Sequence, residues 1–257
     1  MLEVVPLPLL RDNYAYLLID PALKSAVVVD PSESEPVLRA LSERGLSLAG
    51  IWCTHHHVDH VGGVEGLLDA LSEMPVLGSA YDAGHSRIPA QRMALDDGDV
   101  VEHGGEKFRV LEVPGHTLGA IAYVGERHVF TGDTLFLAGC GRVFEGTMPM
   151  MRASLARLRA LPPELSVCCG HEYTESNLGF AATVEPDSQA VRARLEKVRA
   201  QRAAGEITVP GPLSVELETN PFLRWDVDAV RGFAASYGDS STDDEVFARV
   251  REAKDRF

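Results

Sequence analysis

The chain has 257 residues, 45 % of them hydrophobic, and a formal net charge of −14. This composition predicts a globular protein with a full core, in one large domain or in a main domain with a smaller one. The negative charge disfavours nucleic acids and anionic membranes as partners. Because no apolar run approaches a membrane span and no secretory leader opens the chain, we expect a cytoplasmic protein. Four cysteines without a CxxC spacing suit reduced thiols.

The first half of the chain alternates strand and helix patterns. The expected strands are 16–19, 26–29, 48–53 and 76–78, and the expected helices are 35–44 and 64–72. Residues 98–135 then change to strand-like runs separated by glycine-bearing turns. These runs, at 108–113, 120–124 and 128–131, predict a mostly antiparallel sheet. The pattern therefore favours an α/β fold built in layers.

The last third of the chain is helical in pattern. A helix expected at 150–161 and a strand at 166–169 precede it, and a further helix begins at Pro186 and ends at Gly205. No clear strand signal occurs after residue 174. We therefore predict two domains, with an α/β domain at 1–173 and a helical domain at 174–257.

Residues 54–60 read THHHVDH, which is a typical metal-binding pattern. In an extended segment that leaves a strand, His55 and His57 project to one side and His56 to the other. Asp59 and His60 follow at the turn into the next helix, so a second pair of ligands can converge beside the first. Imidazole and carboxylate suit zinc, iron or manganese, and a catalytic site leaves a coordination position for water.

Four local ligands are too few for two metal ions, and three later candidates each follow a predicted strand. They are His116 in VPGHT, Asp133 in TGDT and His171 in CGHEY. Each alone is more often a hydrogen-bonded or turn-forming residue than a ligand. Together with the heptapeptide they predict a two-metal hydrolase, in which the ions generate hydroxide from a bridging water.

These motifs resemble those of the metallo-β-lactamase superfamily. The resemblance is carried by Thr54-His55-His56-His57-Val58-Asp59-His60, Gly115-His116-Thr117, Gly132-Asp133-Thr134 and Gly170-His171. It implies an αβ/βα sandwich of the α/β class, here with a C-terminal helical domain. It also implies that one metal is held by His55, His57 and His116, the other by Asp59, His60 and His171, and that Asp133 bridges the two.

Within that superfamily the chain is similar to the hydroxyacylglutathione hydrolase (glyoxalase II) family over nearly its whole length. The similar stretches are DNYAY at 12–16, LFLAGCGRVFEG at 135–146, GHEYTESNL at 170–178, NPFLR at 220–224 and VREAKD at 250–255. The resemblance implies hydrolysis of S-(2-hydroxyacyl)glutathione, such as S-D-lactoylglutathione, to glutathione and D-lactate in methylglyoxal detoxification. Two divalent ions are expected, zinc ahead of iron or manganese. Asp59 is the candidate for orienting the hydroxide, and Asp133 is the second catalytic carboxylate.

The family's substrate contacts correspond to five residues of this chain. They are Arg142, Phe144, Tyr173, Arg251 and Lys254. Phe144 stands where the family commonly has tyrosine, and Arg142 where it often has lysine. The resemblance thus implies that the helical domain binds substrate and that the partner is a small-molecule glutathione thioester. A monomer is the default expectation.

Three alternatives remain open at this point. The first is a glutathione persulfide dioxygenase of the same superfamily, which uses a single iron; the long helical tail and the VREAKD ending argue against it. The second is a metallo-hydrolase of another thioester, a lactone or a β-lactam, because the metal ligands specify attack on a carbonyl and not which carbonyl. The third is a non-catalytic metal-binding or partner-binding module.

Overall fold

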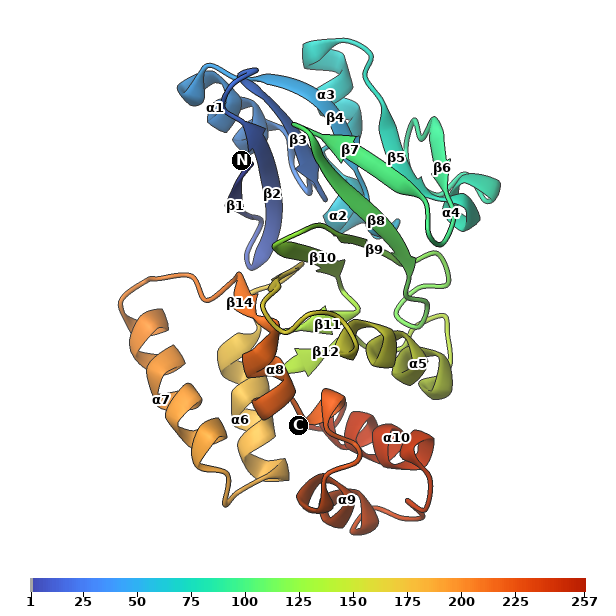
Figure 1. Ribbon diagram of the computed structural model, residues 1–257, viewed down its shortest axis with the longest axis vertical. Helices are drawn as coiled ribbons and strands as arrows, with labels where there is room; N and C mark the ends of the chain where they lie inside the picture. Colours follow the sequence, from blue (N-terminus) through green and yellow to red (C-terminus); the bar gives the residue numbers. More distant parts are fainter. Residues whose placement is uncertain (1) are drawn as a thin grey trace. The chain divides into compact units, whose positions relative to one another are not determined.

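The computed structural model describes residues 2–257, whose helices and strands are labelled in Figure 1. They belong to two compact units. Unit 1 is the chain up to Glu112 together with Gly119–Gly132, and unit 2 is Val113–Leu118 together with Asp133–Phe257. Among residues 2–257, no helix is long and apolar enough to cross a membrane.

Unit 1 contains the alternating strands and helices expected for the first half of the chain. In chain order its elements are β1 (Glu3–Leu9), β2 (Asn13–Asp20), β3 (Ser25–Val29), α1 (Ser34–Arg44), β4 (Ser47–Trp52), α2 (Val58–Val61), α3 (Val64–Leu71), β5 (Val76–Ser79), α4 (Ala80–Gly84), β6 (Met93–Leu95), β7 (Val100–His103), β8 (Glu106–Glu112), β9 (Ile121–Val124) and β10 (His128–Gly132). The sequence pattern did not predict β1, which contains Pro6 and Pro8. At the edge of a sheet, however, a proline breaks no ladder hydrogen bond on its open side.

The first sheet of unit 1 has the strand order β1-β2-β3-β4-β5-β6. The pairs from β1 to β3 are antiparallel, and the pairs from β3 to β6 are parallel. Leu17, Val28 and Ile51 of this sheet share one hydrophobic cluster with Val37 of α1 and Leu67 of α3. The two helices therefore cover one face of the sheet, as buried parallel strands require (Figure 1).

The opposite face packs on a second, antiparallel sheet, in which β10, β9, β8 and β7 follow one another. The Trp52 ring of the first sheet lies 5.2 Å from the rings of both Phe108 and Tyr123. The Tyr123 hydroxyl donates a 3.0 Å hydrogen bond to the carbonyl of Cys53. That bond satisfies a buried backbone group at the point where the chain leaves β4 for the THHHVDH segment. Unit 1 is thus layered as helix, sheet and sheet.

Unit 2 is mainly helical. Its elements are β11 (Leu135–Phe136), β12 (Gly139–Cys140), α5 (Met148–Arg159), β13 (Ser166–Cys169), α6 (Thr174–Val184), α7 (Gln189–Ala203), β14 (Gly211–Pro212), α8 (Leu213–Thr219), the 3-10 helix η1 (Pro221–Leu223), α9 (Asp228–Ala235) and α10 (Asp243–Lys254). The expected helices in this region are confirmed. The expectation of no strand after residue 174 is wrong in one place, because β14 pairs with β13. Two residues are too short to show a strand period.

The C-terminal helices of unit 2 form their own core, in which α6 and α7 lie side by side (Figure 1). The Phe222 ring of η1 lies 6.0 Å from Phe180 of α6 and 5.9 Å from Phe247 of α10. A capping box starts α10: Thr242 accepts from the Glu245 N–H, and Glu245 accepts from the Thr242 N–H. The capping box sets where α10 begins, and the last turn of this helix contains the basic residues Arg251 and Lys254.

Candidate metal centre

Unit 1 gathers the ligands predicted in the THHHVDH segment, which runs from the end of β4 into α2. The His55 ring lies 4.8 Å from the His57 ring and 4.1 Å from the His60 ring, between centroids. The Asp59 Oδ2 atom lies 4.0 Å from Nε2 of His60. The structure therefore brings His55, His57, Asp59 and His60 together in one cluster. His56 directs Nδ1 toward the buried carboxylate of Asp82, at 3.4 Å.

Asp30, which sequence reasoning missed, holds two of these imidazoles in orientation. It follows β3, is 3 % exposed, and accepts hydrogen bonds from the Thr54 N–H at 2.7 Å and the Thr54 hydroxyl at 2.6 Å. His60 Nδ1 lies 3.0 Å from the Asp30 carboxylate, so its proton sits on Nδ1 and Nε2 can bind a metal. Because Thr54 gives its proton to Asp30, its oxygen accepts from Nδ1 of His55 at 3.1 Å. This leaves Nε2 of His55 available to bind a metal.

By spacing alone, Asp30 could itself be a metal ligand. Asp30, His55 and His60 offer ligand atoms within 4.8 Å of one another. Both carboxylate oxygens of Asp30 already accept hydrogen bonds from Thr54, however, so we assign Asp30 a supporting role. The signal that could have found it is the sequence VVVDP, in which an aspartate follows a buried strand just as Asp133 does in TGDT.

Unit 2 brings together the three later ligands, His116, Asp133 and His171. The Asp133 Oδ2 atom lies 3.4 Å from Nε2 of His116 and 3.3 Å from Nε2 of His171. Two ligand atoms bonded at about 2.1 Å to one tetrahedral ion stand about 3.4 Å apart. This spacing fits a carboxylate oxygen and two imidazole nitrogens that take part in metal coordination.

The loop after β12 orients the ring of His116, a predicted ligand. His116 Nδ1 donates to the carbonyl of Arg142 at 2.8 Å, which leaves Nε2 for a metal. The N–H groups of Phe144 and Glu145 both donate to the His116 carbonyl at 3.3 Å. The segment that carries two predicted substrate contacts is therefore hydrogen-bonded directly to a predicted metal ligand.

Gly141 allows this close packing. A Cβ atom at this position would lie 1.9 Å from the Asp133 carbonyl oxygen and 3.1 Å from Nδ1 of His116. We expect Gly141→Ala to destabilise the protein by about 2–3 kcal/mol and to lower the unfolding midpoint by about 5–10 °C. Calorimetry measures the midpoint. The control is Gly179→Ala, whose Cβ would meet nothing closer than 3.8 Å. An unchanged midpoint for Gly141→Ala would contradict the packing argument.

Aromatic rings flank both histidines of unit 2. Tyr173 stacks on His171 with centroids 4.7 Å apart and an interplanar angle of 5°. Phe144, which is 60 % exposed, lies 5.3 Å from the His116 ring and 5.8 Å from the Arg142 guanidinium. The predicted contacts Arg142, Phe144 and Tyr173 therefore lie close to predicted ligands and remain accessible to a small molecule.

The two basic residues of α10 differ in environment. Arg251 is only 5 % exposed; it donates to the Cys140 carbonyl at 2.8 Å and to Asp255 at 3.1 Å. Lys254 is half-buried, with its ammonium 5.4 Å from the Phe180 ring centroid. Burial and the neighbouring Arg251 charge lower the pKa of Lys254 to about 8.

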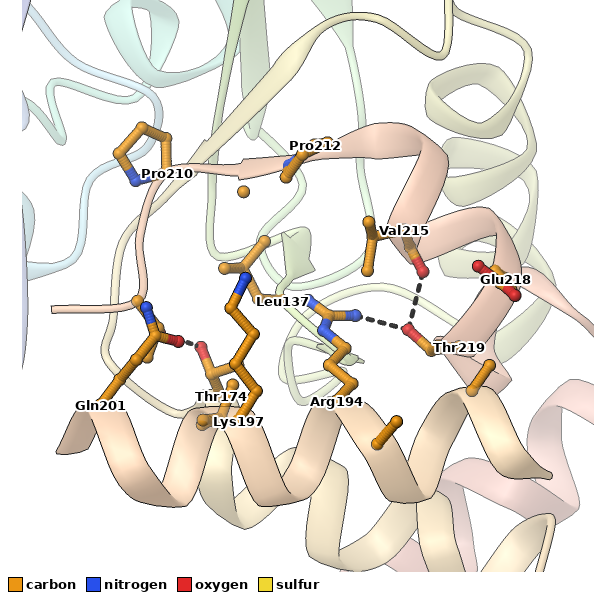
Figure 2. A pocket seen from close by; sticks show the side chains of 15 residues that line it. Leu137, Thr174, Arg194, Lys197, Gln201, Pro210, Pro212, Val215, Glu218 and Thr219 are labelled. Carbon is orange, nitrogen blue, oxygen red and sulfur yellow. Dashed lines mark hydrogen bonds between the residues drawn. The ribbon is translucent and has the colours of Figure 1, made fainter. Parts of the chain in front are cut away.

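A separate cavity of about 500 Å³ lies in unit 2 between α7, β14 and α8 (Figure 2). Arg194 lines it, but its guanidinium donates to Thr219 at 2.5 Å and forms an ion pair with the buried Glu216. None of the predicted metal ligands or substrate contacts is among the residues that line it. This cavity is therefore not the candidate metal centre.

Comparison with known proteins matches the chain along its length. The metallo-beta-lactamase superfamily model matches residues 9–171, and the model of the hydroxyacylglutathione hydrolase C-terminus matches residues 172–257. A hydroxyacylglutathione hydrolase of Gloeobacter violaceus is 50 % identical over 250 residues, which are 96 % of this chain and 97 % of that protein. The chain belongs to the hydroxyacylglutathione hydrolase family. A second relative with that name, from Synechococcus sp., is 48 % identical and covers 100 % of both chains.

Membership in the hydroxyacylglutathione hydrolase family confirms the predicted class, a hydrolase of the metallo-β-lactamase fold followed by a helical C-terminal region. Among solved structures, TTHA1623 in a di-iron-bound form is 28 % identical with a TM-score of 0.61, and the match covers 86 % of this chain and 100 % of that one. The persulfide dioxygenase alternative is not favoured, because the hydrolase C-terminal model accounts for the region after His171. The histidine and aspartate clusters suit divalent metal ions.

Proposed function

We propose that this hydrolase cleaves the thioester bond of S-(2-hydroxyacyl)glutathione. Its representative substrate is S-D-lactoylglutathione, and its products are glutathione and D-lactate. This reaction would serve methylglyoxal detoxification. The observation that carries the proposal is the position of the Asp133 Oδ2 atom, 3.4 Å from Nε2 of His116 and 3.3 Å from Nε2 of His171. A carboxylate that bridges two cations is suited to a water-activating centre, and the curated relatives bear the name of this hydrolase.

We propose a binuclear metal centre with the ligands that the family resemblance implies. One ion would take His55, His57 and His116, and the other Asp59, His60 and His171, with Asp133 between them. Zinc is the proposed metal. Iron and manganese suit the same donors, and a solved relative holds two irons.

The reaction needs little more than an oriented water molecule. Two bound divalent ions would lower the pKa of a bridging water toward neutrality and supply a hydroxide nucleophile. Asp59, whose side chain is 36 % exposed, would accept a hydrogen bond from this water and direct it at the thioester carbonyl. A thiol has a pKa of about 8.5, so glutathione can leave as the thiolate without a protein acid.

The glutathione part of the substrate would bind in unit 2. We assign its contacts to Arg142, Phe144, Tyr173, Arg251 and Lys254, of which the last two belong to the proposed substrate-binding domain at 174–257. Guanidinium and ammonium groups suit the two carboxylates of glutathione. A monomer would suffice for this chemistry. All four cysteines are buried free thiols, which supports a reducing compartment such as the cytoplasm.

The low pKa of Lys254 predicts a pH dependence of substrate capture. With a pKa of about 8, Lys254 is charged below pH 8 and neutral above it, so its attraction for a carboxylate is lost as the pH rises. We expect kcat/KM for S-D-lactoylglutathione to fall about tenfold between pH 7 and pH 9. Lys254→Arg, which stays charged, serves as the control. Parallel pH profiles for the two proteins would contradict this role.

The substrate assignment is tested by comparing thioesters in one assay of thiol release. Wild-type protein loaded with zinc is given S-D-lactoylglutathione and, separately, D-lactoyl-coenzyme A. Oxygen uptake with glutathione persulfide is followed on protein loaded with iron, because zinc has no redox chemistry. We expect rapid release of glutathione, slow release of coenzyme A and no oxygen uptake. Preference for the coenzyme A thioester would overturn the glutathione assignment and leave the hydrolase class intact. Oxygen uptake without hydrolysis would overturn both.

A further inference from the structure

Asn13 links the hairpin of the first sheet to the THHHVDH segment. It is the first residue of β2 and is 5 % exposed. Its side-chain amide, Nδ2, donates to the Asp59 carboxylate oxygen Oδ2 at 3.2 Å and to the Asp59 main-chain carbonyl at 3.0 Å. One NH₂ group therefore holds both the backbone and the carboxylate of a predicted metal ligand.

The surroundings of Asn13 make it a rigid anchor. Asn13 pairs with Leu9 in the β1–β2 ladder. The next residue of the turn, Leu10, donates its N–H to the Glu33 carboxylate at 2.7 Å. The Ser32 hydroxyl also donates to the carbonyl of Asp59. The hairpin turn and the loop after β3 thus hold Asp59 from two directions: Ser32 contacts its main-chain carbonyl, and Asn13 contacts both that carbonyl and the carboxylate.

The chemistry of the donor matters as much as its position. Without a hydrogen bond, the partly exposed carboxylate of Asp59 would sample several rotamers, each of which would weaken metal binding. A lysine or arginine could fix the carboxylate equally well, but its charge would repel the divalent ions. An amide fixes the carboxylate without adding charge. Its two protons also suit the two oxygens that Asn13 contacts.

We propose that Asn13 is a positioning residue that orients the Asp59 carboxylate for metal binding and for directing the attacking water. This inference rests on the proposed function, since it takes Asp59 as a metal ligand. It gives a chemical role to the asparagine of the DNYAY stretch.

Removal of the amide at constant size tests the proposal. Asn13→Leu keeps the side-chain shape and loses both donors, and Asn13→Ala is the second variant in case the leucine does not fold. We expect the weaker zinc site to bind about 10- to 100-fold less tightly in competition with a chromophoric chelator, without substrate present. We expect kcat to fall by a similar factor, with KM for S-D-lactoylglutathione within twofold of wild type. An unchanged KM would show that substrate binding is intact. Weaker zinc binding without substrate would show that the variant has lost the orientation of a metal ligand.

Gln91→Met is the matched control, because Gln91 donates from its amide to the carbonyls of Ser79 at 3.0 Å and Met93 at 3.2 Å in the same unit. We expect this variant to keep wild-type zinc affinity. Wild-type zinc affinity in folded Asn13 variants would overturn the proposal, and so would an equal loss in Gln91→Met. The zinc titration uses no thioester, so it remains decisive for Asn13 even if S-D-lactoylglutathione is not the substrate.

Discussion

Asp133→Asn is expected to lower kcat by about 1,000-fold or more and to remove at least one metal ion per chain. The reason is the position of the Asp133 Oδ2 atom, which lies 3.4 Å from Nε2 of His116 and 3.3 Å from Nε2 of His171. Asparagine keeps the shape of the side chain, but its neutral oxygen cannot offset the repulsion between two divalent ions. Asp133→Ala should be at least as severe.

The measurement combines steady-state hydrolysis with metal analysis of the purified variant. Asp226→Asn is a suitable control, because Asp226 is also a carboxylate of unit 2 but pairs with Arg159 at 2.7 Å on a partly exposed surface. It should keep two ions per chain and wild-type kcat. A folded Asp133→Asn protein with two bound ions and kcat within tenfold of wild type would refute the bridging role.

The double variant Arg251→Ala with Lys254→Ala is expected to raise KM for S-D-lactoylglutathione about 100-fold, with kcat changed much less. Hydrogen bonds to a charged group contribute about 1.5–3 kcal/mol each, and about 1.4 kcal/mol corresponds to a factor of ten. The single variants should differ. Lys254→Ala should raise KM alone, whereas Arg251→Ala should also lower the unfolding midpoint, because it leaves the buried Cys140 carbonyl without its 2.8 Å donor.

Arg249→Ala controls for loss of positive charge on the same helix, since Arg249 pairs with Glu252 at 2.8 Å near the surface. We expect its KM to stay within twofold of wild type. If the double variant retains the wild-type KM, α10 does not bind the glutathione carboxylates. An equal rise in KM for Arg249→Ala would instead indicate a nonspecific effect of net charge.

The sequence indicated ligands better than it indicated the residues that orient them. His55, His57 and His60 stand in one heptapeptide, where strand alternation and a helix turn fix their relation locally. Asp30 lies 24 residues before Thr54 and 30 before His60, so only the parallel pairing of β3 with β4 explains its contacts. Asn13 is a similar case, because it lies 46 residues before Asp59 in the sequence.

The predictions for the basic helix α10 were likewise limited to what local sequence spacing can indicate. A shared helix face for Arg251 and Lys254 followed from their spacing, and both do lie in the last turn of α10. Their different burial did not follow from it. Arg251 is buried because the Cys140 carbonyl, from a distant segment, accepts its hydrogen bond. Lys254 lies over the ring of Phe180, which belongs to α6.

The sequence by itself predicted the layered α/β fold and indicated which residue types are the candidate metal ligands, because residue type and local periodicity carry that information. Only the tertiary structure decided which nitrogen each candidate histidine leaves available for a metal and what orients its ring. His60 presents Nε2 because Asp30 takes Nδ1, and His116 does so because the Arg142 carbonyl takes Nδ1. A tautomer is fixed by a hydrogen-bond partner, and here the partners come from parts of the chain that only folding brings to the ligand.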